Sequence, residues 1–137
     1  ERKGDIMFKV GDEFNSKFKI SNDIYDGFVN IFNDKNPMHV DLDFAKNHGY
    51  SGIVMHGNIL NGFISHFIGE QLPVKNIVIL SQNIKFNNPV YLNDLLQFNA
   101  SVFEIYESVN VINFKFKFIN QKNITVAKGK VQIKKFN

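Results

Sequence analysis

The chain of 137 residues contains no cysteine, which excludes disulfide bonds, thiolate metal sites and a cysteine nucleophile. No apolar run approaches the roughly 20 residues that a membrane-spanning helix needs. No charged-then-apolar segment near the N-terminus has the pattern of a secretory signal. We therefore expect a cytoplasmic protein without membrane contact. Its length predicts one domain with a hydrophobic core.

Acidic residues are also missing from the last part of the chain. No Asp or Glu follows Glu107, whereas seven lysines do: Lys115, Lys117, Lys122, Lys128, Lys130, Lys134 and Lys135. One interpretation is a solvated strand face, and the other is a basic surface for a phosphate-bearing or acidic partner. We do not expect nucleic acid as the partner, because no helix-turn-helix, aromatic RNA-binding signature or zinc-ligand spacing is present.

The first half of the chain has the pattern of one strand followed by helices. Alternating apolar residues predict a strand over residues 14–20. Ser21 is a suitable N-cap for a short helix that ends near Asp34, and Asp41 is a suitable N-cap for a second one. Apolar residues three and four apart then predict a longer helix over residues 57–68.

The second half has the pattern of strands, with period-two alternation clearest over residues 114–118. Lone Gly129 predicts a bulge in the last strand. One strand, short helices, a long central helix and an antiparallel meander together predict an α+β domain. Residues 1–6 have the character of an N-terminal tail or a cloning remnant, which leaves residues 7–137 as a single domain with Met7 as a plausible native start.

The most informative segment is residues 32–41, together with the His-Gly pair at 56–57. It places Asp34 and His39 on either side of an Asn-Pro pair, which predicts a rigid bend. A carboxylate and an imidazole held close together can share a water and move its protons. Gly57 lies where the long helix begins, and a helix start offers unpaired N–H groups to a developing negative charge. An acid–base pair beside an oxyanion donor is suited to add water to an unsaturated acyl thioester, or to remove water from a hydroxyacyl thioester.

Three motifs occur in series: Asp34-Lys35-Asn36-Pro37-Met38-His39-Val40-Asp41, then Phe44-Ala45, then Gly52-Ile53-Val54-Met55-His56-Gly57. Together they resemble the MaoC-like dehydratase family, and within it the single-domain (R)-specific enoyl-CoA hydratases. Weaker matches extend the resemblance over most of the chain: Val10-Gly11-Asp12, Phe86-Asn87-Asn88-Pro89-Val90 and Asp94. The resemblance implies a hot-dog fold, in which an antiparallel sheet wraps around a long helix. It also implies a homodimer or a dimer of dimers, with the acyl pocket near the subunit interface.

The resemblance further implies the roles of individual residues. Asp34 and His39 match the catalytic pair, and Gly57 matches the residue whose backbone N–H binds the thioester oxygen. Four further residues match supporting positions or flank the site: Asn36, Pro37, Ser65 and His56. No metal is expected, and no cofactor beyond the coenzyme A or phosphopantetheine that is part of the substrate. The expected partner is thus an acyl-CoA or an acyl carrier protein.

Two residues depart from the family pattern, which affects the expected pocket shape and substrate. Asn33 stands where glycine is usual, and Asn58 where methionine is common. A metal site is the alternative use of the same region, because Asp34, His39, Asp41 and His56 have side chains that suit zinc or iron. Asp41 has a competing role as an N-cap, however, and hydration needs no metal.

The expected function is reversible hydration of a trans-2-enoyl thioester to an (R)-3-hydroxyacyl thioester. Two alternatives stay open on the sequence. One is a hot-dog acyl thioesterase, which would use the same pocket to release a free thiol. The other is a non-catalytic module that binds acyl thioesters without turnover.

Overall fold

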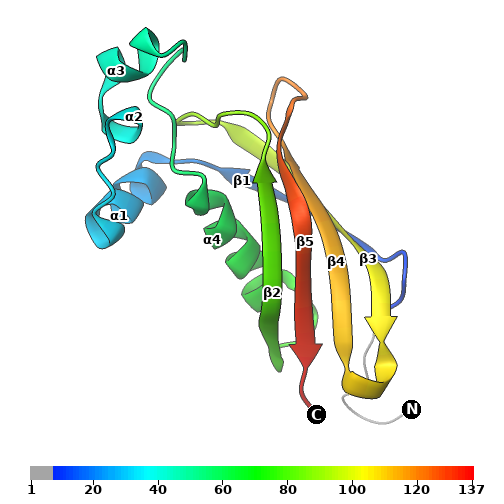
Figure 1. The fold of residues 1–137 in the computed structure, drawn as a ribbon. Coiled ribbons are helices and arrows are strands. Elements are labelled where there is room, and N and C mark those ends of the chain that lie inside the picture. The colour runs from blue at the N-terminus through cyan, green and yellow to red at the C-terminus, as the bar shows by residue number, and fades with distance from the viewer. Residues whose placement is uncertain (1–7) are drawn as a thin grey trace.

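The computed structural model describes residues 8–137 and contains one sheet of five antiparallel strands (Figure 1). The strands are β1 (Glu13–Lys19), β2 (Ile77–Phe86), β3 (Leu95–Tyr106), β4 (Val111–Ile119) and β5 (Thr125–Lys135). Their order in the sheet is β1-β3-β4-β5-β2, so β1 and β2 are the edge strands. The α+β prediction is confirmed. The predicted tail over residues 1–6, and the predicted start at residue 7, lie outside the described residues.

Four short α-helices precede β2. They are α1 (Asn22–Phe32), α2 (Pro37–Val40), α3 (Leu42–Asn47) and α4 (Asn58–His66). A π-helical turn, η1 (Phe67–Gln71), follows α4, and a 3₁₀ turn, η2 (Glu107–Val109), links β3 to β4. The Ser21 side chain accepts a hydrogen bond from the N–H of Ile24, as its predicted N-cap role requires. In the part of the chain described, no helix combines the length and hydropathy needed to cross a membrane.

The α-helical part of the central helix is shorter than the sequence pattern predicts. This part, α4, has nine residues, and the five residues of η1 continue it with wider π geometry. Apolar spacing alone cannot separate the two geometries, because both bury Phe67 and Ile68. The helix nevertheless occupies the predicted place, against one face of the sheet (Figure 1).

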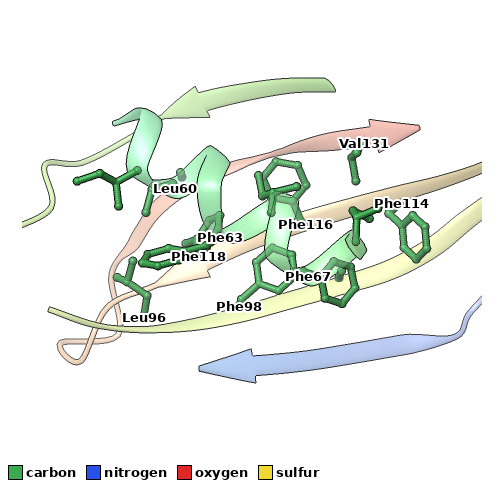
Figure 2. Packing of buried hydrophobic residues seen from close by; sticks show 14 of the residues in the cluster. Leu60, Phe63, Phe67, Leu96, Phe98, Phe114, Phe116, Phe118 and Val131 are labelled. Atoms are coloured by element: carbon green, nitrogen blue, oxygen red, sulfur yellow. The ribbon is translucent and has the colours of Figure 1, made fainter. Parts of the chain in front are cut away.

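The core lies between α4–η1 and this face of the sheet (Figure 2). Leu60, Phe63 and Phe67 supply the helix side. Alternating residues of three strands supply the sheet side: Leu96, Phe98, Phe114, Phe116, Phe118 and Val131. Burying one such side chain stabilises the fold by about 1.5–3 kcal/mol. This packing fixes the position of the helix along the sheet, and therefore the position of its N-terminal end at Gly57.

Strand alternation places four lysines of the basic C-terminal part on the opposite face, whereas Lys135 alternates with them and is buried. In β4, Lys115 and Lys117 are exposed, whereas the three phenylalanines that flank them are buried. The same alternation in β5 exposes Lys128 and Lys130. The sheet therefore has an apolar inner face and a basic outer face.

Gly129 lies between these two lysines, and the predicted bulge at this residue is wrong. Gly129 pairs in register with Phe116 on β4 and with Ile84 on β2. A Cβ atom at this position would lie 2.0 Å from the backbone oxygen of Asn83. Glycine is required here because the backbones of β5 and β2 approach closely, which is the other common reason for a glycine inside a strand.

We predict that Gly129→Ala lowers the free energy of unfolding by about 1–3 kcal/mol, because the added methyl group forces these backbones apart. Urea denaturation would measure the change. Gly69→Ala is the matched control, since nothing lies within 4 Å of a Cβ atom at Gly69. An unfolding midpoint for Gly129→Ala equal to that of Gly69→Ala would contradict the close-approach explanation.

Candidate active site

Local hydrogen bonds build the turn that carries Asp34 and His39. The Asp34 side chain accepts from the N–H of Asn36 at 3.2 Å. The Asn36 side chain in turn accepts from the N–H of Met38 at 3.1 Å and so caps α2. Pro37 occupies the start of α2, where its missing N–H has no cost. The predicted bend is present, with Asp34 before it and His39 on the short helix after it.

A second segment, residues 54–56, holds this turn from the other side. The Nδ1 atom of His39 lies 2.8 Å from the carbonyl oxygen of Val54, and the N–H of Val54 donates to the carbonyl of Met38 at 3.1 Å. The Nε2 atom of His56 lies 2.8 Å from the backbone oxygen of Asp34. These reciprocal bonds fix both ends of the turn. The bond from His56 orients the backbone at Asp34.

The same bonds define which ring nitrogens carry protons. A carbonyl only accepts, so Nδ1 of His39 and Nε2 of His56 are the donors. In the neutral rings, the lone pairs then lie on Nε2 of His39 and Nδ1 of His56. The two rings stack with centroids 4.0 Å apart. Nδ1 of His56 is buried and has no hydrogen-bond partner within residues 8–137. Because Nδ1 of His39 donates to Val54, the lone pair on its Nε2 remains available for chemistry.

Asp34, His39 and His56 form a compact group of possible ligands or proton carriers. Each offers one atom, and these atoms all lie within 4.8 Å of one another. Asp41, the fourth candidate ligand from the sequence, is used elsewhere, because its side chain caps α3 by accepting from the N–H of Phe44 at 3.1 Å. The lone pairs that could bind a metal are those that acid–base chemistry would use. The absence of a metal stays a prediction.

Helix α1 covers the histidines, and it supplies a residue that the sequence analysis missed. The hydroxyl of Tyr25 donates to the backbone oxygen of His39 at 2.6 Å, and the ring of Phe28 packs on His56 with centroids 4.7 Å apart. Burial, reinforced by the charge of Asp26, raises the pKa of Tyr25, so the phenol keeps the proton that it donates. Tyr25 lies three residues before Phe28, so helical spacing could have placed both on one face.

Gly57 lies at the start of α4, as predicted. Within residues 8–137 its N–H has no hydrogen-bond acceptor, which leaves the helix start open to a ligand. A Cβ atom here would lie 2.8 Å from the ring of Phe86, so glycine lets this ring pack against the helix start.

Ser65 is exposed and lies eight residues after Gly57, which is about 12 Å along the helix axis. The structure does not bring it to the Gly57 end, and its supporting role stays a prediction.

An apolar groove of about 1050 Å³ lies between α1 and α4 and includes Asp34 in its lining. Its apolar lining residues are Phe18, Ile24, Phe28, Ile31, Phe32, Ile59 and Phe63. Ile31 and Phe32 are 76% and 67% exposed, so much of the apolar face of α1 is uncovered in the single chain. Asn58, the second departure from the family pattern, also lines this groove.

The first departure, Asn33, has a local explanation. It ends α1 in the left-handed conformation, with φ 55° and ψ 31°. Glycine adopts this conformation without strain, and asparagine tolerates it better than other residues with side chains. Asn33 therefore preserves the chain reversal that a glycine would give.

We predict that Asn33→Val destabilises the fold by about 1–2 kcal/mol, because a β-branched side chain clashes with the backbone at positive φ. Asn33→Gly should stay within about 1 kcal/mol of the wild type. Thermal unfolding of the three proteins measures both values. Equal stability of the valine and glycine variants would show that the left-handed conformation is not maintained at this position.

Comparison with known proteins places this scaffold among the sheet-and-helix domains that act on acyl thioesters. The sequence profile described as MaoC like domain matches residues 10–125, and the chain belongs to this family.

Two curated relatives illustrate the similarity. The (R)-specific enoyl-CoA hydratase of Aeromonas caviae is 26% identical over 107 residues, which cover 78% of this chain and 80% of the relative. The mitochondrial 3-hydroxyacyl-[acyl-carrier-protein] dehydratase of Arabidopsis thaliana is 25% identical over 126 residues, which cover 90% and 75% respectively.

Solved structures confirm the expected hot-dog fold. The R-hydratase of Pseudomonas aeruginosa, in its unliganded form, superposes with a TM-score of 0.84 at 26% identity over 93% of this chain and 82% of that chain. The (R)-hydratase of A. caviae superposes with a TM-score of 0.86 at 23% identity over 95% and 98%.

Proposed function

We propose that this chain is a hydro-lyase, which adds water reversibly to a trans-2-enoyl thioester and forms an (R)-3-hydroxyacyl thioester. The observation that carries the proposal is the Asp34–His39 pair, which hydrogen bonds hold beside an open helix start. The names of the relatives, enoyl-CoA hydratase and 3-hydroxyacyl-[acyl-carrier-protein] dehydratase, support the same chemistry.

The pair is suited to orient one water molecule. The carboxylate of Asp34 and the free Nε2 of His39 are both acceptors, so a shared water donates a hydrogen to each. Its oxygen lone pairs then point away from the pair, toward the β-carbon of the substrate. As the oxygen attacks, one of the two groups takes a proton from the water, and the group that has taken it then delivers a proton to the α-carbon on the same face. Dehydration is the reverse.

The open helix start stabilises the charge that this attack creates. Electrons of the double bond move onto the thioester oxygen, where the N–H of Gly57 donates a hydrogen bond to the oxyanion. One such donor typically contributes about 3–4 kcal/mol in the transition state. The groove between α1 and α4 is the proposed acyl site, because it is apolar and borders Asp34.

We predict that Asp34→Asn lowers turnover of crotonyl-CoA at least about 100-fold, because the amide cannot take the water proton. His39→Ala should have an effect of similar size. Loss of enoyl absorbance measures turnover, and circular dichroism checks that each variant folds. Asp43→Asn is the matched control, since Asp43 is an exposed carboxylate in the first turn of α3.

Turnover of Asp34→Asn within twofold of Asp43→Asn would overturn the assignment. Release of free thiol without loss of enoyl absorbance would instead identify a thioesterase. Tight binding of crotonyl-CoA without either change would identify a binding module.

The substrate carrier is coenzyme A or an acyl carrier protein, and either one brings its own pantetheine arm. We propose that the reaction uses no other cofactor and no metal, and that it takes place in the cytoplasm. Dialysis against a chelator should therefore leave the turnover unchanged.

We also propose that the protein is a homodimer. Strand β2 is an edge strand of ten residues, and a long edge with unpaired backbone groups is suited to pair with a second copy. The exposed Ile31 and Phe32 lie on the wall of the acyl groove, where a second subunit would exclude water. Light scattering should give twice the mass of the chain, and a monomer at assay concentrations would contradict the proposal.

A further inference from the structure

The outer face of the sheet contains a broad depression of about 830 Å³, which spans all five strands. Five exposed lysines line it: Lys85, Lys115, Lys117, Lys128 and Lys130. The aromatic ring in its lining, that of Phe116, is 4% exposed. We call this surface the lysine face. It is separate from the groove that borders Asp34.

The register of the strands places these lysines directly opposite one another. Lys115 pairs with Lys130, and Lys117 pairs with Lys128 across β4 and β5. Lys128 also pairs with Lys85 across β5 and β2. Like charges directly opposite on one face destabilise a sheet.

No carboxylate relieves this repulsion among the described residues. None of the five lysines forms an ion pair there, and the acidic residue in the lining, Glu13, lies on β1, two strands away from β4. The Nζ atom of Lys130 lies 5.1 Å from the ring centroid of Phe103. This cation–π contact is weak because the ammonium group is exposed to water. The lysine face therefore lowers stability in the isolated chain, which favours the interpretation of a docking surface over that of a solvated strand face.

The shape and composition of the lysine face favour an acidic protein as the partner. Lysines lie about 4.8 Å apart across strands and about 6.6 Å apart along them. Carboxylates one helical turn apart have a similar spacing of about 5–6 Å. Sites for single-stranded nucleic acids typically combine a basic groove with exposed aromatic rings on which the bases stack. The one aromatic residue lining the depression is buried.

We propose that the lysine face docks an acidic helix of the carrier protein that delivers the acyl thioester. This inference rests on the proposed function, and it names the partner of that site. Lys85 immediately precedes Phe86, whose ring packs against Gly57 at the start of α4. The lysine face thus reaches the strand end nearest the oxyanion donor. A carrier bound there would hold its prosthetic arm beside the active site.

The test compares the crotonyl thioesters of an acidic acyl carrier protein and of coenzyme A. Lys128→Glu places one carboxylate between Lys117 and Lys85. It should lower kcat/KM for the carrier thioester about tenfold at low salt, with a smaller effect at high salt. The value for crotonyl-CoA should stay within twofold. Lys122→Glu, which makes the same charge change in the β4–β5 loop, is the matched control.

A second measurement separates docking from folding and from catalysis. Lys128→Glu should raise the thermal unfolding midpoint above that of Lys122→Glu, because it converts two repulsive pairs into attractive ones. Fluorescence anisotropy should give a weaker affinity of this variant for the labelled carrier protein. This readout does not depend on turnover, so a failure of the proposed hydration would leave it interpretable.

Four results would overturn the docking proposal. The first is unchanged turnover and binding of the carrier thioester by Lys128→Glu. The second is an equal loss with crotonyl-CoA, which would assign the lysine face to the coenzyme phosphates. The third is a wild-type protein that hydrates crotonyl-CoA but not the carrier thioester, which would leave the proposed function intact. The fourth is tight binding of a single-stranded oligonucleotide that Lys128→Glu abolishes.

Discussion

The packing of one helix into a single curved sheet is the constraint on which the rest of the structure depends. A sheet with one apolar face needs a cover, and α4 with η1 is the helical element that the fold places against it (Figure 2). Because Leu60, Phe63 and Phe67 interlock with sheet phenylalanines, the helix cannot slide along the sheet. Its N-terminal end is therefore fixed, and so is the N–H of Gly57. The packing of the core therefore holds the candidate oxyanion donor in a fixed position.

The acid–base pair is positioned by a different means, since it lies on short elements outside the sheet. Helix α2 has only four residues and could not be stable alone. It is held because the turn around Asp34 and His39 exchanges hydrogen bonds with residues 54–56, and because Tyr25 binds the backbone of His39. Each of these bonds joins one side chain to the backbone of a neighbouring segment. The site geometry thus depends on the identity of three side chains: His39, His56 and Tyr25.

The sequence predicted what depends on periodicity and on local caps. The alternation around Lys115 and Lys117 located β4, and the N-cap roles of Ser21 and Asp41 were visible from residue type alone. The turn carrying the candidate pair was predicted from an Asn-Pro dipeptide. What depends on tertiary approach was missed: the contact of Tyr25 with His39, and the reason for Gly129. The π geometry of η1 was also missed, because it preserves the apolar pattern of an α-helix.

The left-handed residues of the chain have a consequence for the unfolded state. Within residues 8–137, the non-glycine residues with positive φ are all asparagines: Asn33, Asn93, Asn110 and Asn123. A glycine at each position would relax the folded turn, but it would also give the denatured chain many more conformations to lose on folding. Asparagine adds a little steric strain to the native turn. It also lowers the entropy of the denatured ensemble, which favours the folded state. The thermal stability of these turns thus depends partly on the conformational entropy of the unfolded chain, which asparagine keeps lower than glycine would.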